Sequence, residues 1–345
     1  MINIISGPCS AESEEQVFAT ASALSKLDCS GCGMKMTAFR AGLWKPRTHP
    51  GSFEGVGVEG LPWLVRVQKE LGLKVIVEVA SPAHVESVLK AGLDMVWIGA
   101  RTTTNPFAMQ DIADSLMGVD IPVFVKNPMN PDLELWIGAV ERVLRAGVPQ
   151  VCAIHRGFSF YEKIRYRNMP KWQVAVDFMQ RLPQVPLYCD PSHISGSREY
   201  LAEVSQRALD LGFGGLFIES HCNPSAALSD SAQQVTPAQL EAILRSLTVK
   251  HSDSDDEATA ASMKEIRARI DVVDENILDM LAARMELVDE IGSLKHRHNM
   301  TVLQQARWEE IIRKMSEGAS LRGLDEDFVR ELFKLVHQAA IDRQS

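Results

Sequence analysis

The chain has 345 residues, of which 46% are hydrophobic and 23% charged, and its formal net charge is −9. This length suggests either one large domain or two ordinary domains. An acidic chain without a basic tail or a basic, aromatic-interleaved stripe is a poor candidate for nucleic-acid binding. The apolar stretches are shorter than the roughly 20 residues that span a bilayer, and the N-terminus lacks the features of an export signal. We therefore expect a cytoplasmic protein.

Short apolar runs alternate with amphipathic helical patterns from residue 2 to about residue 247. The runs are apolar throughout, which indicates strands covered on both faces, as in the parallel sheets of α/β proteins. Eight strand–helix units in about 245 residues predict a (β/α)8 barrel of the TIM type. A doubly wound open sheet is the alternative, but no G-x-G-x-x-G motif follows the first strand. The expected strands are 2–6, 33–39, 74–79, 94–99, 122–126, 150–155, 186–190 and 215–220, and the expected helices are 14–27, 61–71, 83–91, 106–117, 133–146, 172–182, 198–211 and 238–247.

The composition changes after residue 250, where HSDSDDEATAAS (251–262) has the polar, acidic and small residues of a linker. Ser262-Met263-Lys264-Glu265 fits a capping box, so a helix is expected to begin there and to run to about His298, some 50 Å. Two shorter helices are expected over 304–317 and 325–343, separated by Gly318 and Gly323. We predict a barrel domain at 1–248, an acidic linker at 249–262 and an all-α domain at 263–345.

Three helices of which one is very long cannot close a good core within one chain. We therefore expect the helical domain to form an intertwined homodimer. Coiled-coil packing without any chemistry is the alternative.

Charged or metal-competent residues follow all eight expected strands. In a (β/α)8 barrel these positions converge on the active-site mouth. A single loop arginine is usually a solvated surface charge, but recurrence after every strand favours an active site for anionic substrates. In strand order the residues are Cys9; Arg40, Lys45 and Arg47; Glu78; Arg101; Lys126; His155 and Arg156; Asp190 and His193; and Glu219 and His221.

The cations among these residues suit phosphate and carboxylate groups, since arginine offers a planar fork and lysine a compact charge. Lys45-Pro46-Arg47-Thr48 places two cations and a hydroxyl around a rigid proline. Fixed cations would offset the repulsion between two negatively charged substrates.

A second set has the chemistry of metal ligands. Thiolate, imidazole and carboxylate together suit a divalent first-row metal without selecting one. The candidates are Cys9, His193, Glu219 and Asp230, and by spacing alone Asp190, His221 or Cys222 could replace a member. A separate C-x-x-C motif, Cys29 to Cys32, would suit a redox pair or half a zinc site, although buried inert thiols are more common.

Seven sequence blocks resemble the signature segments of the 3-deoxy-D-arabino-heptulosonate 7-phosphate synthase family, in its microbial subgroup with short barrels. The resemblance covers nearly all of residues 2–247 in the family's order. It implies condensation of phosphoenolpyruvate with erythrose 4-phosphate, the first step of the shikimate pathway. The blocks are GPCSAE, RAGLWKPRTHPGSFEG, IGARTTTNP, VKNP, HRG, DPSHISG and FIESHCNPSAALSD.

The resemblance also implies roles for individual residues. It makes Cys9, His193, Glu219 and Asp230 the ligands of one divalent metal ion, either Mn, Co, Fe or Zn. Phosphoenolpyruvate would be surrounded by Arg40, Lys45, Arg101, Lys126 and Arg156, and erythrose 4-phosphate by Lys45, Pro46, Arg47 and Thr48, with Asp190 near its hydroxyl.

The implied mechanism assigns further tasks. Glu78 or Lys126 would assist the addition of water, and His155 would either shuttle a proton or orient its loop. A family with related chemistry condenses phosphoenolpyruvate with arabinose 5-phosphate to form an octulosonate. It carries a different block at the position of Lys45-Pro46-Arg47-Thr48, which favours erythrose 4-phosphate here.

The tail, over about residues 263–344, resembles the all-helical chorismate mutase family, which needs no cofactor. The resemblance implies substrate contacts from Arg267, Arg284, Lys295, Arg307 and the C-terminal Gln344. The chain departs from the family pattern at Gln304, Trp308 and Ala340, where relatives place an aspartate, an acid and a serine. The resemblance implies that these positions contact the ring hydroxyl and a carboxylate of the substrate, and Gln304 is expected to keep a substrate contact.

Helix geometry bears on this site independently. Lys295 lies eleven residues after Arg284, nearly three turns, so both lie on one helix face. Arg267 precedes Arg284 by seventeen residues, about 25 Å along the axis and on another face. One small ligand could hardly reach all three in one chain, so a second protomer would have to supply Arg267.

Two ordered motif sets joined by a linker predict a bifunctional enzyme that acts on phosphoenolpyruvate, erythrose 4-phosphate and chorismate. A helical domain that only senses ligands or dimerises is the alternative. Because the barrel begins almost at residue 2, an N-terminal regulatory extension is not expected. We therefore expect chorismate or prephenate bound by the tail to inhibit the barrel.

Overall fold

The computed structural model describes residues 1–46, 51–161, 165–250 and 256–344. The chain divides into a barrel unit, Met1–Ser252, and a helical unit, Asp253–Ser345. Among the described residues, no helix has both the length and the apolarity needed to cross a membrane.

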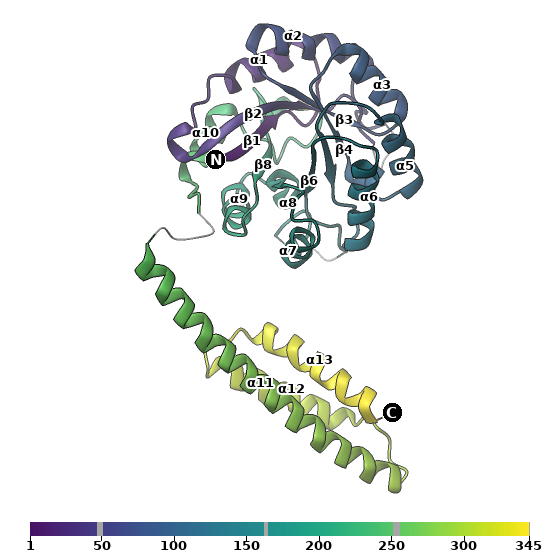
Figure 1. Ribbon diagram of the computed structural model, residues 1–345, viewed down its shortest axis with the longest axis vertical. Helices are drawn as coiled ribbons and strands as arrows, with labels where there is room; N and C mark the ends of the chain where they lie inside the picture. The colour runs from purple at the N-terminus through teal and green to yellow at the C-terminus, as the bar shows by residue number, and fades with distance from the viewer. Residues whose placement is uncertain (47–50, 162–164, 251–255, 345) are drawn as a thin grey trace. The chain divides into compact units, whose positions relative to one another are not determined.

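The barrel unit is a closed parallel barrel in which every strand pairs with its neighbours in chain order, β1 with β8 completing the ring. The helices pack outside the strands (Figure 1). The predicted (β/α)8 fold is confirmed. The strands are β1 Ile2–Gly7, β2 Met34–Ala41, β3 Val75–Val79, β4 Met95–Ile98, β5 Val123–Lys126, β6 Val151–His155, β7 Leu187–Cys189 and β8 Gly215–Glu219.

The helices of the barrel unit follow the predicted pattern, with ends that differ by a few residues. Short helices that the sequence patterns did not reveal follow β4 and β7. The α-helices are α1 Glu14–Leu24, α2 Leu61–Leu71, α3 Pro82–Ala91, α4 Ala100–Thr103, α5 Pro106–Ser115, α6 Leu133–Arg145, α7 Trp172–Arg181, α8 Pro191–Ser195, α9 Leu201–Asp210 and α10 Pro237–Ser246; the short 3-10 turns are η1 Ser30–Cys32, η2 Gly57–Gly60 and η3 Pro224–Ala226.

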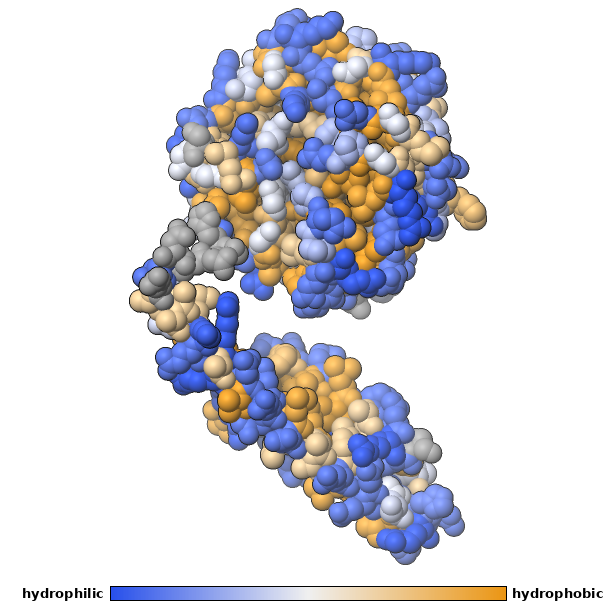
Figure 2. Space-filling model, in the orientation of Figure 1, coloured by the Kyte–Doolittle hydropathy of each residue, from blue (hydrophilic) through white to orange (hydrophobic). Residues whose placement is uncertain are grey.

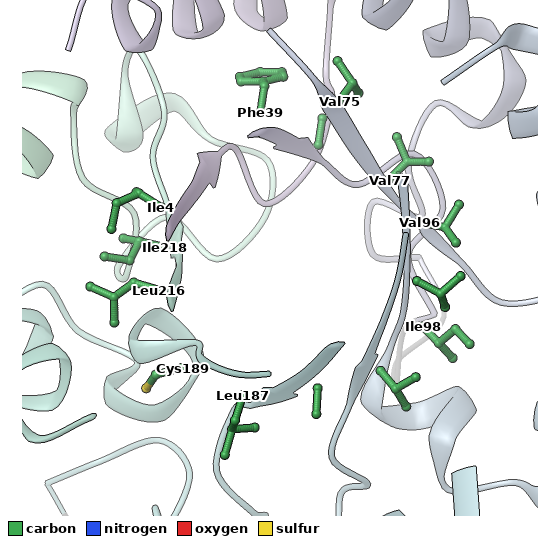
Figure 3. Packing of buried hydrophobic residues seen from close by; sticks show 14 of the residues in the cluster. Ile4, Phe39, Val75, Val77, Val96, Ile98, Leu187, Cys189, Leu216 and Ile218 are labelled. Carbon is green, nitrogen blue, oxygen red and sulfur yellow. The ribbon is translucent and has the colours of Figure 1, made fainter. Parts of the chain in front are cut away.

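Alternation along each strand divides the core into two sets of side chains. One set, which includes Ile4, Val77 and Ile218, points away from the barrel axis toward the helices (Figure 3). The other set fills the barrel interior with residues such as Ile76, Trp97 and Phe217. Both faces of every strand are therefore apolar, which explains why the strand runs show no polar alternation.

The interior set becomes charged at the carboxyl ends of the strands. A charged residue stands two positions after an interior apolar residue and therefore on the same, inward face of its strand. Arg40 stands in this way after Ala38, and Glu219 after Phe217. The same step relates Glu78, Lys126, Arg156 and Asp190 to Ile76, Phe124, Ile154 and Tyr188. The fold thus gathers the charges at one mouth of the barrel.

The helical unit contains α11 Glu257–Arg297, α12 Gln305–Ser320 and α13 Glu326–Gln344. Helix α11 packs on α13, and α12 packs on α13 (Figure 1). The long first helix was predicted, but its start at a Ser262 capping box was wrong. Asp256 caps the helix by accepting a hydrogen bond from the Thr259 amide at 2.9 Å, and Ser262 lies inside it, donating to the Ala258 carbonyl at 2.9 Å.

The predicted break at Gly318 was also wrong, since this residue lies within α12. The chain turns instead at Gly323, whose φ of 68° lies in the left-handed region that glycine adopts at little cost.

Candidate active sites

A polar pocket opens at the carboxyl end of the barrel. Its empty volume is about 510 Å³, including the open mouth. Four cationic side chains reach this small space, so a ligand with several negative charges would fit it best. The lining residues are Cys9, Lys45, Pro46, Glu78, Ala100, Arg101, Lys126, Met129, Arg156, His193 and Asp230.

Three potential metal ligands come together beside this pocket. The ligand atoms of Cys9, Glu219 and Asp230 all lie within 4.8 Å of one another. Burial, together with the charge of Glu219, raises the pKa of the Cys9 thiol to about 12. A cation at this position would favour the thiolate and relieve the repulsion between the carboxylates, so the donor set fits a divalent metal ion.

His193 lies at the pocket wall but outside that group of three. Its Nδ1 is 3.9 Å from Glu219 Oε1 and 2.8 Å from Asp190 Oδ2, although the latter contact lacks the alignment of a hydrogen bond. Of the four predicted ligands, the structure therefore groups three and leaves the fourth nearby. Among the described residues, His221 and Cys222 do not join the group, and His221 Nε2 lies 3.5 Å from Glu12.

Two residues that the sequence reasoning missed hold the ligand side chains. Gln233 donates from Nε2 to Glu219 Oε2 at 2.7 Å. Arg167 donates from Nη1 to Asp230 Oδ1 at 2.9 Å and to Gln233 Oε1 at 2.8 Å. Gln233 could have been suspected because it follows Asp230 in the same loop, whereas Arg167 lies twelve residues beyond the end of β6, far along a long loop.

Arg40 lies beneath the pocket, fully buried. Its Nη2 donates to Glu219 Oε1 at 3.1 Å, and its guanidinium carbon lies 4.5 Å from the centroid of the Phe217 ring. Nε and Nη1 have no hydrogen-bond partner among the described residues, and Nη1 is 4.0 Å from Asp190 Oδ2. Arg40 thus places a positive charge under the pocket floor.

Two buried lysines line the pocket, each beside a carboxylate. Lys45 Nζ lies 3.4 Å from Glu78 Oε2, and Lys126 Nζ donates to Asp190 Oδ2 at 2.7 Å. Burial lowers the pKa of Lys126, while Asp190 opposes that shift. Each lysine thus presents a cation to the pocket beside a carboxylate.

Asp190, predicted near a substrate hydroxyl, is fully buried and engaged within the protein. Its Oδ1 accepts the His193 amide at 3.0 Å and so caps α8, while its Oδ2 accepts from Lys126. Burial alone would raise the pKa of Asp190, but His193, Lys126 and Arg40 together hold it well below its ordinary value. Asp190 is placed to orient Lys126 and His193.

Arg156 reaches the pocket from the end of β6. Its amide donates to Asn127 Oδ1 at 2.7 Å, and its Nη1 donates to Asn168 Oδ1 at 2.9 Å. Arg101 lines the same pocket from α4 and is exposed. Arg101 and Arg156 therefore both line the pocket, and their contacts with an anion stay a prediction.

Part of the predicted erythrose 4-phosphate segment, Arg47 and Thr48, lies outside the described residues. Lys45 and Pro46, which precede it, line the pocket. Next to them, Trp44 stacks on His84 with ring centroids 4.1 Å apart.

His155 requires a correction, because the structure places it away from the pocket. His155 is the last residue of β6. Because side chains alternate along a strand and Ile154 points into the barrel, His155 points outward. Its ring lies 5.5 Å from Trp172 and 5.6 Å from Phe158. Neither ring nitrogen has a well-formed hydrogen bond among the described residues, and burial lowers its pKa to about 3, against a smaller opposing effect of the Pro170 carbonyl. A proton shuttle is therefore not supported.

The C-x-x-C cysteines are free thiols, and Cys29 is buried. Within the part of the chain that the structure describes, they belong to no cluster of three potential metal ligands.

In the helical unit, two predicted substrate contacts meet directly. Lys295 Nζ on α11 donates to Gln344 Oε1 on α13 at 3.1 Å and to the Val302 carbonyl at 2.5 Å. Arg284 and Lys295 both act electrostatically on His337 of α13, lowering its pKa together with burial, which is the larger cause. Arg284 Nη1 is buried without a hydrogen-bond partner among the described residues.

The other predicted contacts of this unit face solvent. Arg267 and Gln304 are exposed, and Gln304 caps α12 without a side-chain hydrogen bond. Arg307 donates to Glu310 on its own helix at 2.6 Å. One chain therefore assembles Arg284, Lys295 and Gln344 but leaves Arg267 and Arg307 apart.

Comparison with known proteins identifies both units. Residues 1–254 match the DAHP synthetase I family, and residues 266–345 match chorismate mutase type II. A phospho-2-dehydro-3-deoxyheptonate aldolase of Thermotoga maritima is 32% identical over 232 residues, an alignment that covers 67% of this chain and 64% of that protein, so this chain spans less than two thirds of the relative's length. A 2-dehydro-3-deoxyphosphooctonate aldolase of Azoarcus sp. is 27% identical over 259 residues, covering 71% of this chain and 88% of that protein.

A solved structure agrees with the fold. The crystal structure of the DAHP synthase of Thermotoga maritima aligns with a TM-score of 0.61 and 26% identity, covering 72% of each chain. The chain therefore belongs to the DAHP synthetase I family and carries a chorismate mutase type II domain at residues 266–345.

Proposed function

We propose that this chain is a bifunctional enzyme of the shikimate pathway. Its barrel would condense phosphoenolpyruvate with erythrose 4-phosphate to give 3-deoxy-D-arabino-heptulosonate 7-phosphate and phosphate. Its helical unit would rearrange chorismate to prephenate. We place the protein in the cytoplasm, where these soluble metabolites are converted.

The observation that carries the first activity is the thiol–carboxylate group of Cys9, Glu219 and Asp230 beside four pocket cations. We infer that these residues, joined by His193, hold one Mn, Co, Fe or Zn ion. A divalent metal bound there would supply Lewis-acid polarisation of the aldehyde carbonyl. The metal-ligand atoms and the cations face the same pocket, so the aldehyde and the phosphorylated enol would lie side by side.

The cations would position the two substrates. Lys126, Arg101 and Arg156 surround one side of the pocket and suit the phosphate and carboxylate of phosphoenolpyruvate. Lys45 and Pro46 lie where the segment with Arg47 and Thr48 begins, and would receive the phosphate of the aldose. Holding both anions together offsets their repulsion and converts a bimolecular encounter into an oriented one.

The reaction balances without an external oxidant. Carbon 3 of phosphoenolpyruvate attacks the aldehyde carbon and forms the new carbon–carbon bond as the carbonyl π bond breaks. The aldehyde oxygen takes that electron pair and then a proton to become a hydroxyl, and carbon 2 is left with cationic character. Water adds at carbon 2, and phosphate leaves by cleavage of its bond to that carbon. Glu78, paired with Lys45 at 3.4 Å, is the carboxylate that lines the pocket beside the lysines and would accept the proton of the water.

The second activity rests on the cationic pair Arg284 and Lys295. Chorismate carries two carboxylates, and its rearrangement needs a compact conformer and stabilisation of the breaking ether oxygen. Arg284, with a buried donor that has no partner among the described residues, and Lys295, beside Gln344, would provide both.

A homodimer through the helical unit would complete this site. Arg267 lies about 25 Å along α11 from Arg284, too far to share one small ligand. Large apolar side chains on α11 are exposed in a single chain, among them Ile266 at 54%, Ile270 at 52% and Ile277 at 52%. Hydrophobic surface is visible on this unit (Figure 2). Such a surface suits a second copy, which would also bring its own Arg267.

Two candidates compete with this proposal. The octulosonate aldolases are relatives of the barrel, so arabinose 5-phosphate is the alternative acceptor. The departures at Gln304, Trp308 and Ala340 leave open a helical unit that binds ligands without catalysis.

Paired assays on the full-length chain test the proposal. With added divalent metal, phosphoenolpyruvate should be consumed with erythrose 4-phosphate and not with arabinose 5-phosphate. Chorismate should be converted in a separate assay, and Arg284→Ala should abolish that conversion. Absence of the first reaction would refute the barrel assignment; binding of chorismate without turnover would support the sensor.

A further inference from the structure

His337 and Trp308 form a stacked pair in the helical unit. Their ring centroids are 4.2 Å apart and their planes 13° from parallel, one ring on α13 and the other on α12. Such a stack restricts the rotation of the imidazole and fixes the direction of its nitrogens. Trp308 is one of the residues at which the chain departs from the chorismate mutase pattern.

The His337 ring carries a polar atom without a protein partner. Among the residues that the structure describes, Nε2 is buried and makes no hydrogen bond. A buried polar atom without a protein partner destabilises a fold unless water or a ligand satisfies it. Arg284 Nη1 has the same property in the same unit.

His337 shares its surroundings with the residues of the proposed mutase site. Arg284 and Lys295 on α11 are close enough to disfavour a charged imidazole. Gln344, which accepts from Lys295 at 3.1 Å, lies seven residues after His337 on α13, two turns further along the same face. The unpartnered nitrogen therefore belongs to the same cluster as the cations.

We propose that His337 is a substrate-contacting residue of the helical unit, whose Nε2 forms a hydrogen bond with the ring hydroxyl of the bound dianion. This inference rests on the proposed mutase function and assigns one more residue to it. Both carboxylates and the breaking ether oxygen of the substrate are best matched by cations, so the hydroxyl is the polar group that remains. Arg284 and Lys295 both disfavour the charged imidazole, and a neutral imidazole suits a neutral hydroxyl.

The same contact explains how the chain tolerates its departures from the family pattern. With Trp308 in place of an acid and the buried Ala340 in place of a serine, neither position offers a side-chain oxygen. Trp308 instead supports the histidine, and Ala340 lies three residues after it, on the same face of α13. Trp308 is thus a positioning residue.

Substitution of His337 in the full-length chain tests the inference. His337→Phe keeps an aromatic ring to stack on Trp308 but removes Nε2, so kcat/KM for chorismate should fall about tenfold, the effect of one hydrogen bond. His337→Gln should retain more activity than His337→Phe, because the amide can still contact the hydroxyl. His296→Phe, the same change at an exposed histidine of α11, is the matched control and should match the wild type.

A second measurement does not depend on turnover. In the nitrogen-15 spectrum of histidine-labelled protein, prephenate should shift the His337 Nε2 resonance, which the His337→Phe spectrum identifies. Wild-type turnover with an unchanged kcat/KM in His337→Phe would overturn the inference and leave the proposed function intact. A wild type that fails to convert chorismate but shows the shift would contradict mutase activity and support the contact.

Discussion

Cys9 and Asp230 are joined by a hydrogen bond, with Sγ 3.4 Å from Oδ2, although 221 residues separate them in the chain. Cys9 follows the first strand of the barrel and Asp230 lies in the loop after the last. Since β1 pairs with β8, closing the ring brings these two loops together. The thiol and the carboxylate, which look unrelated in the sequence, therefore form one corner of a potential metal site.

Replacing Cys9 tests that site. Cys9→Ala should lower kcat/KM of the barrel reaction about a hundredfold or more, because Lewis-acid assistance contributes several kcal/mol. Chorismate turnover should stay close to that of the wild type, since the mutase residues lie in the other unit. Phosphoenolpyruvate consumption and chorismate consumption by the same preparation give both rates. Full synthase activity in Cys9→Ala would remove the thiol from the mechanism.

Arg167 should act on the metal through Asp230. Arg167→Met removes the hydrogen bonds to Asp230 and Gln233, and loss of such a supporting residue typically weakens metal binding about 10- to 100-fold. Titration with Mn²⁺ followed by calorimetry measures this without reference to turnover. Arg165→Met, two residues away and paired with the exposed Glu203, is the control and should bind Mn²⁺ as the wild type does. Equal affinities in all three proteins would show that Arg167 does not support the ligands.

His155 should make the stability of the barrel sensitive to acid. Its pKa is about 3 in the folded chain against an ordinary value of 6.5, so below pH 6.5 the unfolded chain binds the proton more readily. The stabilising contribution is present above pH 6.5 and is lost as the pH falls, by about 2 kcal/mol at pH 5. His155→Phe preserves the aromatic contacts and should flatten this dependence.

Urea unfolding at about pH 7.5 and pH 5 provides the measurement for His155. At about pH 7.5, where His155 is neutral, the free energy of unfolding of His155→Phe compared with the wild type shows whether the substitution itself disturbs packing. If the free energy of unfolding falls between pH 7.5 and pH 5 as much in His155→Phe as in the wild type, His155 is not the group responsible for the acid sensitivity.

The sequence predicted which residues gather at the mouth where they stand at strand ends, because the end of a barrel strand determines which mouth a side chain approaches. It failed where the outcome depended on the face of a strand: His155 is adjacent to Arg156, yet only Arg156 reaches the pocket. Arg167 and Gln233 escaped notice because their task is set by contacts between loops. The start of α11 was misplaced since Ser262 and Asp256 both offer capping groups, and only Asp256 lies at the end of the helix.

The final prediction concerns control of the barrel by the helical unit. If prephenate inhibits the synthase by binding near Arg284, Arg284→Ala should abolish that inhibition and leave the uninhibited synthase rate unchanged, because this residue belongs to the other unit. The measurement is the rate of phosphoenolpyruvate consumption with and without prephenate. A chain lacking residues 250–345 should be equally insensitive, provided that it retains synthase activity. Any effect of prephenate on the barrel requires different affinities for its more active and less active states. Inhibition that persists in both variants would place the inhibitor site on the barrel itself and contradict this route.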